Sequence, residues 1–302
     1  MAQRIKKGRD VSGILILDKP LNISSSQAVQ RIKRLFGAKK VGHTGSLDPL
    51  ASGVLPICLG HATKVSQYLL ASDKSYQFTM QLGQTTTTGD VEGDVLIERP
   101  VPAIELEQVT RLLSQYCGDI QQVPPMYSAL KHNGQRLYKL ARAGEVVERP
   151  ARDVTIKSLK LLSADSTSLT IEVCCTKGTY VRTLAEDLGE SLGCGAHVTF
   201  LRRIKTGPFE LARSLTLDQL ERHAGSFSSL DALLLDIDVA LLDYPVVNCS
   251  EDDKSDLCMG RAVVHEGLAD HALMRLNDPR GKIFGLGKWS QANLLAPVRI
   301  FA

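Results

Sequence analysis

Asp48 has the local surroundings of a catalytic carboxylate. It lies in residues 41–56, where glycines at positions 42, 45 and 53 permit positive φ and a close backbone approach to a ligand. Pro49 disfavours helical backbone at Asp48, so the carboxylate is expected on an extended or turn segment, with His43 close in sequence. A carboxylate presented in this way can act as a nucleophile or as a general base. An Asp-Pro turn beside a buried histidine would give the same local pattern.

Arg182 is a cation whose predicted position indicates a nearby carboxylate. Thr179 is expected to cap a helix, which places Tyr180 and Arg182 at its start and away from the centre of its buried stripe. That stripe is expected to consist of Val181, Leu184, Ala185 and Leu188. A cation in the first turn opposes the helix dipole, so a nearby carboxylate would explain it. The alternative is an arginine that is simply exposed.

Tyr76 belongs to a predicted strand with clear alternation. In residues 75–82 one face carries the apolar side chains Tyr76, Phe78, Met80 and Leu82. Tyr76 is therefore most simply a core aromatic, although a residue near a strand end can also line a cleft. A second strand is predicted within residues 193–207, where Leu201 precedes the pair Arg202 and Arg203.

The elements expected to position these residues alternate between strands and helices. Residues 13–20 predict a buried strand, and a serine among positions 24–26 is expected to cap a helix that ends at Gly37. Residues 154–162 and 169–176 predict two strands joined by a turn.

Composition places the chain among ordinary globular proteins. Of its 302 residues, 43% are hydrophobic and 23% are charged. No apolar run reaches the ~20 residues needed to span a bilayer. None of the seven cysteines forms a Cys-x-x-Cys pair, and Cys174 and Cys175 are expected to be buried thiols. We therefore expect a cytoplasmic protein, without a metal ion.

Positive charge is concentrated in two stretches, although the net charge is only +3. The first comprises Arg4, Lys6, Lys7, Arg9, Lys19, Arg31, Lys33, Arg34, Lys39 and Lys40. The second comprises Lys131, Arg136, Lys139, Arg142, Arg149 and Arg152. Such bands favour a phosphate backbone as the partner, and a solvated protein surface is the alternative.

The segment GHTGSLDPLASGVLP at residues 42–56 resembles the catalytic-aspartate motif of the TruB family, the tRNA pseudouridine synthases that act on the T-loop uridine at position 55. Ser46 and Ser52 replace the threonines that are usual there, which keeps the hydroxyls. The resemblance implies an isomerase with Asp48 as its catalytic carboxylate. Arg182 would pair with Asp48 and keep it ionised, and Tyr76 would stack on the uracil and could transfer a proton at C5.

The resemblance also implies residues that bind the substrate. These are His43, Tyr76, Tyr180, Leu201, Lys19, Lys64, Asp90 and Arg202. His43 would fill the space left when the uridine is flipped out of its stack. Arg202 and Arg203 would lie near phosphate, and residues 124–152 would form a thumb that closes over the RNA. No cofactor is implied.

The fold implied by the resemblance is α+β. Residues 1–245 would form the pseudouridine synthase domain, a mixed and mainly antiparallel sheet with flanking helices. Residues 246–302 would add a small β-barrel of the PUA type that binds RNA. We expect a monomer, because no heptad pattern or large apolar stripe indicates an interface with a second copy. The resemblance implies that it binds the T-arm of tRNA.

Two other functions fit part of the sequence. A noncatalytic tRNA-binding or tRNA-folding protein would explain the basic stretches but would leave Asp48 and Arg182 without a role, and a folding role could also accompany catalysis. A glycosidase would normally need two nearby carboxylates, and no second acid is as well placed as Asp48.

Overall fold

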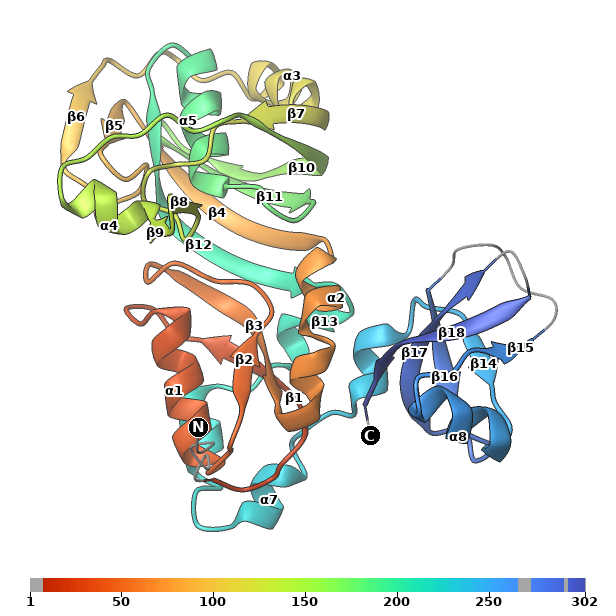
Figure 1. Cartoon of the computed structure of the whole chain (residues 1–302). Coiled ribbons are helices and arrows are strands. Elements are labelled where there is room, and N and C mark those ends of the chain that lie inside the picture. Colours follow the sequence, from red (N-terminus) through yellow and green to blue (C-terminus); the bar gives the residue numbers. More distant parts are fainter. Residues whose placement is uncertain (1–7, 266–272, 291–292, 302) are drawn as a thin grey trace.

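A computed structural model describes residues 8–265, 273–290 and 293–301 of the chain. Within these ranges a nine-stranded sheet runs through a large body, and a five-stranded sheet forms a smaller body at the C-terminal end (Figure 1). The basic residues Arg4, Lys6 and Lys7 lie outside the described residues. In the part of the chain that is described, no helix is long and apolar enough to cross a membrane.

The large sheet is mixed and mainly antiparallel, as expected. Its strands are β1 (Gly13–Lys19), β2 (Val41–His43), β3 (Ala51–Leu59), β4 (Lys74–Leu82), β7 (Gly118–Gln122), β10 (Arg152–Ala164), β11 (Ser168–Cys175), β12 (Ala196–Thr206) and β13 (Phe209–Glu210). The order is β1-β3-β12-β4-β11-β10-β7, with β2 beside β3 and β13 beside β12. Strands β3 and β12 pair in parallel, and the other pairings are antiparallel. This arrangement joins residues near position 50 to residues near position 200.

Helices flank this sheet. They are α1 (Ser25–Leu35), η1 (Gly60–Lys64), α2 (Ser66–Ala71), α3 (Leu106–Gln115), α4 (Leu137–Arg142), α5 (Val181–Ser191), η2 (Leu211–Arg213), α6 (Leu217–Glu221), α7 (Phe227–Asp231) and η3 (Ile237–Leu241). The predicted cap of α1 is confirmed, because Ser24 accepts a hydrogen bond from the Gln27 amide. The predicted cap of α5 is wrong. Tyr180 occupies that position, and the Thr179 hydroxyl donates instead to the Thr176 carbonyl, 2.9 Å away.

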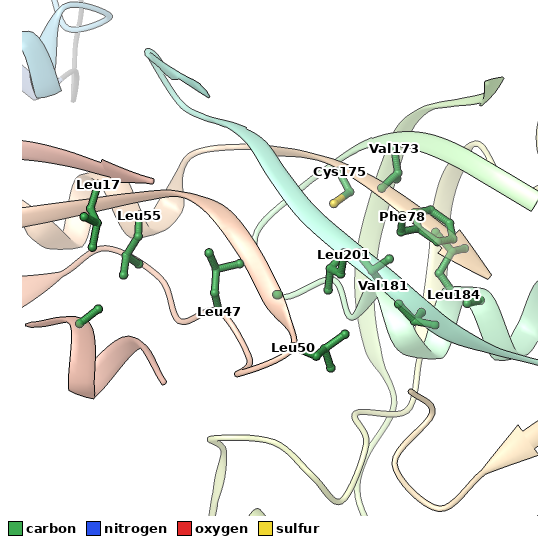
Figure 2. Close-up of a cluster of buried hydrophobic side chains, with 14 of the residues drawn as sticks. Leu17, Leu47, Leu50, Leu55, Phe78, Val173, Cys175, Val181, Leu184 and Leu201 are labelled. Carbon is green, nitrogen blue, oxygen red and sulfur yellow. The ribbon is translucent and has the colours of Figure 1, made fainter. Parts of the chain in front are cut away.

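The main core lies between this sheet and its helices and extends to the loop that carries Asp48. Phe78 and Met80 of β4 are fully buried, as the alternation predicted, and Leu184 of α5 is buried with them. Figure 2 shows Leu47 and Leu50, the two leucines around Asp48, in the same cluster as Leu201. Each buried leucine contributes about 2 kcal/mol of hydrophobic stabilisation, so the loop is anchored on both sides of the aspartate.

Two small hairpins extend from the large body near the site. One pairs β5 (Gln84–Thr86) with β6 (Val95–Glu98), and it belongs to a segment that also carries Asp90. The other pairs β8 (Lys131–His132) with β9 (Gln135–Arg136) and leads directly into α4. This second hairpin and α4 lie within residues 124–152, which we call the thumb.

The C-terminal body is a curled half-barrel with one helix. Its elements are β14 (Val246–Asn248), α8 (Glu251–Cys258), β15 (Val263–Val264), β16 (Leu273–Asn277), β17 (Ile283–Ser290) and β18 (Leu294–Ile300). The strand order is β14-β16-β17-β18-β15, so β14 and β15 form opposite edges of the curled sheet. Trp289 and Leu257 lie in its own core, whereas Leu286 and Phe301 join a cluster with Ile14 and Val54 of the large sheet. This apolar contact connects the two bodies.

Candidate active site

The loop between β2 and β3 holds Asp48 in place through its neighbours. Ser25, at the start of α1, accepts a hydrogen bond from the Leu47 amide at 2.7 Å and donates to the Leu47 carbonyl at 2.9 Å. The Ala51 amide donates to the Asp48 carbonyl at 3.1 Å, which closes a turn around Pro49. The backbone on either side of Asp48 is therefore held by specific hydrogen bonds.

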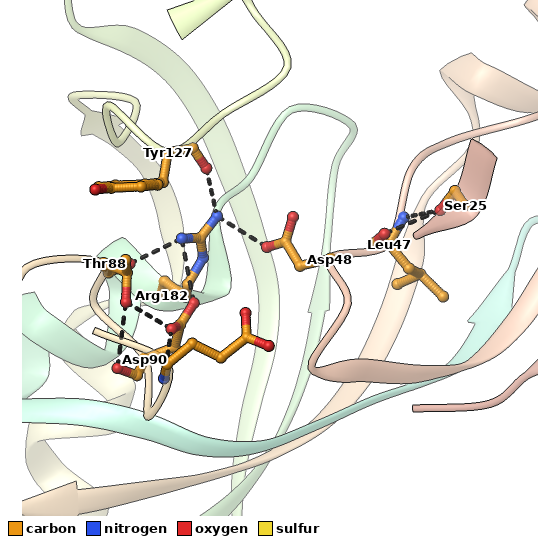
Figure 3. Close-up of polar contacts among 8 residues, drawn as sticks. Ser25, Leu47, Asp48, Thr88, Asp90, Tyr127 and Arg182 are labelled. Carbon is orange, nitrogen blue, oxygen red and sulfur yellow. Dashed lines mark hydrogen bonds and ion pairs between the residues drawn. The ribbon is translucent and has the colours of Figure 1, made fainter. Parts of the chain in front are cut away.

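Arg182 joins two carboxylates and two loops (Figure 3). Its Nη2 lies 2.8 Å from Oδ2 of Asp48, and its Nη1 lies 3.3 Å from Oδ2 of Asp90. The same guanidinium donates to the carbonyls of Thr88 and Tyr127, both at 2.8 Å. The ion pair that the sequence led us to expect between Arg182 and Asp48 is present. Arg182 is buried, so it is not the exposed arginine that was the alternative.

Asp90 is a buried carboxylate with polar contacts on both oxygens. Its Oδ1 accepts hydrogen bonds from the Thr88 hydroxyl at 2.6 Å and from the Glu92 amide at 3.1 Å, while Oδ2 faces Arg182. Burial and the nearby negative charges of Asp90 and Asp48 raise the pKa of Glu92. A buried arginine between two carboxylates is well compensated, which satisfies the electrostatic requirement of its burial.

A cavity of about 260 Å³ opens beside Asp48. It is lined by Gly45, Ser46, Leu47, Asp48, Leu70, Lys74, Tyr76, Ser128, Ala129, Thr176, Lys177, Gly178, Thr179, Tyr180, Val181, Arg182, Leu201 and Arg203. The structure thus brings Asp48, Tyr76 and Leu201 together, as well as Tyr180 and Arg182. We call this space the reaction cavity.

The two tyrosines of the reaction cavity are both neutral at physiological pH. Burial is the main cause that raises the pKa of Tyr76, and the Arg203 guanidinium opposes this effect. Burial also raises the pKa of Tyr180, against the effect of a hydrogen bond with Ser128. The cavity therefore offers two neutral aromatic rings, several aliphatic side chains and one carboxylate.

A second cavity, of about 420 Å³, lies on another side of Asp48. It is lined by the start of α1, the loop that carries Asp48, the hairpin segment with Asp90, the thumb, and Arg182 of α5. The thumb contributes Tyr127, Tyr138 and Arg142, and the guanidinium carbon of Arg142 lies 5.8 Å from the centre of the Tyr138 ring. Asp48 thus stands where the two cavities meet.

His43 lies at the end of β2, two residues before Gly45. The Gly45 amide donates to Nδ1 of His43 at 3.3 Å, which makes Nδ1 an acceptor. Burial and the charge of Arg203 lower the pKa of His43. The imidazole is therefore neutral at physiological pH and is held in one orientation.

Five of the predicted substrate-binding residues do not line the reaction cavity: His43 and Asp90, described above, and Lys19, Lys64 and Arg202. Lys19 is fully buried, and its ammonium donates to the carbonyls of Pro20 and Ile23 at 2.8 and 2.7 Å. Lys64 donates to the Ile300 carbonyl at 2.9 Å, at the contact between the two bodies. Arg202 points to the other face of β12 and bonds to Asp18 at 2.7 Å. Their contacts with a substrate stay predictions.

Two buried cations of the reaction cavity were not assigned to it from the sequence. Arg203, expected near phosphate, is 1% exposed, and Lys74 is 7% exposed. Side-chain alternation could have found both, since Lys74 precedes Tyr76 by two residues and Arg203 follows Leu201 by two. Each therefore shares a strand face with a residue of the predicted site.

Comparisons with known families match almost the whole chain. Residues 33–181 match the TruB family pseudouridylate synthase N-terminal domain, and residues 182–242 match the tRNA pseudouridylate synthase B C-terminal domain. Residues 245–301 match the pseudouridine synthase II TruB C-terminal model. The order and the extent of these matches agree with the motifs in the sequence.

Relatives and solved structures agree with this result. The chain is 52% identical over 302 residues to the tRNA pseudouridine synthase B of Stutzerimonas stutzeri (strain A1501), with 99% of each chain covered. It is also 52% identical, with the same coverage, to the enzyme of that name from Pseudomonas aeruginosa (strain UCBPP-PA14). A crystal structure of a Cbf5-Nop10-Gar1 complex contains a chain of similar fold, with a TM-score of 0.74 and 26% identity over 96% of this chain and 85% of that one. The chain therefore belongs to the TruB family of tRNA pseudouridine synthases, which are isomerases.

Proposed function

We propose that this protein converts the T-loop uridine at position 55 of tRNA to pseudouridine, with Asp48 as the catalytic carboxylate. The observation that carries the proposal is the position of Asp48, held by Arg182 at the edge of a cavity lined by Tyr76, Tyr180 and Leu201. The flipped uracil would enter this cavity, of about 260 Å³, beside the Asp48 carboxylate.

The reaction requires one carboxylate beside the sugar and a surface that holds the base. The N1–C1′ bond breaks, and its electron pair leaves with the uracil. Asp48 either bonds to C1′ or removes the proton from C2′. The uracil then turns and C5 bonds to C1′, while the bond from Asp48 to C1′ breaks or, in the second case, the proton returns to C2′. The C5 proton then leaves and N1 takes up a proton, so that the product is an isomer of the substrate.

The neutral rings of the reaction cavity suit the turning step. Tyr76 would stack on the uracil and, near C5, could take up its proton. Leu201 would pack against the base from β12, next to β4 in the sheet. Arg182 would orient Asp48 throughout, because its position is fixed by two backbone carbonyls and by Asp90.

A uridine inside a folded T loop must first leave its stack, which costs a few kcal/mol. His43 is neutral and rigidly oriented, so it would fill the vacated space as a flat ring. The thumb would offset the remaining cost through Lys139 and Arg142, and through stacking on Tyr138, which contributes ~1–3 kcal/mol per base.

The proposal divides the chain into two parts with different roles. Residues 1–245 would bind the T-arm and carry out the reaction, and residues 246–302 would add RNA contacts. The enzyme would act as a monomer in the cytoplasm, where its tRNA substrate is found, without a cofactor. A role in tRNA folding would accompany catalysis through the same binding surface.

Tritium release from tRNA labelled at uracil C5 tests the proposal. We expect release by the wild type, with no free uracil, and no release by Asp48→Asn, which keeps the shape of the side chain. Both proteins should bind tRNA with similar affinity. Glu107→Gln, an exposed change on α3, is the matched control and should release tritium at the wild-type rate.

Other results would point to other functions. Tight tRNA binding without release by the wild type would contradict the catalytic role and favour a noncatalytic tRNA-folding protein. A second control is a labelled tRNA whose position 55 is already pseudouridine. Tritium release from this tRNA would come from another uridine and would contradict the choice of target.

A further inference from the structure

Lys74 and Arg203 are two buried cations without a carboxylate partner. Lys74 is 7% exposed and Arg203 is 1% exposed. Within the described part of the chain, the ion pairs include neither side chain. Burial of a charge without a counter-ion is costly, and most proteins avoid it. This pair is therefore better explained by an anion that arrives during the reaction than by stability.

Both cations face the reaction cavity from the side of the sheet. Lys74 and Tyr76 extend from β4, and Arg203 extends from β12, where it pairs with Tyr76 in the register. A methyl group built on Gly45 would lie 3.6 Å from Nη1 of Arg203 and 4.0 Å from Cε of Lys74, so the two side chains meet behind the loop that carries Asp48. The cavity thus has a carboxylate at one wall and two cations at another.

The proposed reaction creates an anion in this cavity. When the N1–C1′ bond breaks, the electron pair stays on N1, and the uracil carries a negative charge spread over N1, O2, N3 and O4. Fixed positive charge in a site of low dielectric stabilises such charge strongly, and it does so without reorganisation at the moment of reaction. Asp48 cannot supply this stabilisation, because its own charge is negative.

We propose that Lys74, together with Arg203, stabilises the uracil anion that forms when the base is detached from its sugar. This assignment rests on the proposed function. It gives the two cations a role that is distinct from that of Arg182, which holds Asp48, and it makes Lys74 an electrostatic component of the reaction cavity.

Structural roles explain only part of what these residues do. Arg203 donates to the carbonyls of Val54 at 2.7 Å and of Gly45 at 3.1 Å, so it also fastens the loop. Lys74 donates to the carbonyl of Leu70 in the last turn of α2, at 2.8 Å, and to the carbonyl of Ser72, which follows this helix. A neutral donor would serve that purpose, and it would avoid the cost of a buried charge. Lys74 is therefore the cleaner residue to test.

The acid-base properties of Lys74 agree with the assignment. Burial, and then the charge of Arg203, lower the pKa of Lys74 to about 8. The other charged or titratable groups around it are Cys175, Asp73 and Lys177. Burial raises the pKa of Cys175 to about 11, so this thiol does not titrate near pH 8. Below pH 8 the ammonium is charged, and an anion beside it would keep it charged at higher pH.

Single-turnover rates with Lys74→Met and Lys74→Gln test the proposal. Glutamine can still donate to the two carbonyls, so a purely structural role predicts that it keeps activity. We expect both variants to lose ~10²-fold in the rate at saturating enzyme, with the Kd for tRNA changed less than about twofold. Lys74→Arg should keep most of the rate. Lys160→Met, which removes an exposed charge from β10, should leave both quantities unchanged.

The pH profile provides a second readout that a structural role would not change. At subsaturating enzyme, the wild-type rate should fall above about pH 8. In Lys74→Arg this fall should move to higher pH, because a guanidinium stays charged. Burial also lowers the pKa of Lys19 to about 8. Lys19 is present in both proteins, so its titration contributes equally to the two pH profiles.

Three outcomes would overturn the proposal in different ways. A rate within threefold of wild type in Lys74→Gln would show that the charge is not used. A raised Kd with an unchanged saturating rate would mean that Lys74 binds a phosphate of the substrate instead. No tritium release by the wild type would overturn the proposed function itself, and this is distinguishable because the first two outcomes require an active wild type.

Discussion

Arg182 has 4% of its side chain exposed, whereas Asp48, 2.8 Å from it, has 41% exposed. The ion pair is thus buried on one side and open on the other. Arg182 is fixed by Asp90 and by the carbonyls of Thr88 and Tyr127, so it can orient Asp48 without enclosing it. A nucleophile or base needs this combination, because its carboxylate must be both held in one position and accessible to the sugar.

Replacement of Arg182 by lysine should abolish most of the activity. An ammonium is a single point charge on a flexible stem, so it cannot contact both carboxylates and both carbonyls. We expect the single-turnover rate of Arg182→Lys to fall by ~10²-fold or more, with tRNA affinity retained. Arg111→Lys, on the exposed side of α3, serves as the control. Wild-type activity in Arg182→Lys would mean that charge alone is sufficient.

Ser25→Ala should make the loop that carries Asp48 less rigidly held, while Asp48 itself is unchanged. The change removes both hydrogen bonds between Ser25 and the backbone of Leu47. We expect a loss of ~1–3 kcal/mol in the free energy of unfolding, because a buried amide and carbonyl lose their partner. The rate should fall more than the tRNA affinity. The neighbouring Ser26→Ala, at an exposed position, should change the stability little, and equal effects of the two changes would contradict this explanation.

The pH dependence of stability should report on Glu186, one turn after Arg182 in α5. Burial is the main cause that raises its pKa from 4.5 to about 7. Between these values the unfolded chain has released the proton that the folded chain keeps, so the free energy of unfolding falls as the pH rises through this window. Glu186→Gln removes this loss. Relative to wild type, the variant should gain up to about 3 kcal/mol between pH 4.5 and pH 7, measured by urea unfolding. A difference independent of pH would contradict the prediction.

Neutralisation of the thumb should reduce the salt dependence of tRNA binding. Lys139 is exposed on α4, and Arg142 lines the second cavity beside Tyr138. If both contact phosphates, the double change Lys139→Gln and Arg142→Gln lowers the slope of log K against log salt by about two at most. Fluorescence titration over a range of KCl measures this slope. Replacement of Lys160 and Arg111 by glutamine removes the same charge elsewhere, and an equal decrease there would indicate a general charge effect.

Local sequence was sufficient for the parts of the site that depend on neighbours along the chain. The glycines and Pro49 predicted a loop around Asp48, the serines at positions 24–26 predicted the start of α1, and the alternation in residues 75–82 predicted the strand that carries Tyr76. These features follow from backbone preferences and from the two-residue period of a strand, which act over a few residues. The family motif added the expected pairing of Asp48 with Arg182.

Tertiary structure decided which cations serve which purpose. In the sequence Arg202 and Arg203 are adjacent and equivalent, yet β12 turns Arg202 towards Asp18 and buries Arg203 behind the reaction cavity. Lys19, which was expected to bind the substrate, and Lys74, which no motif singled out, are both buried by the sheet. The physical reason is that burial and ion pairing depend on strands paired across more than a hundred residues, such as β3 with β12. The sequence by itself determined the chemistry-bearing side chains, and the packing of the sheet determined their electrostatic environment.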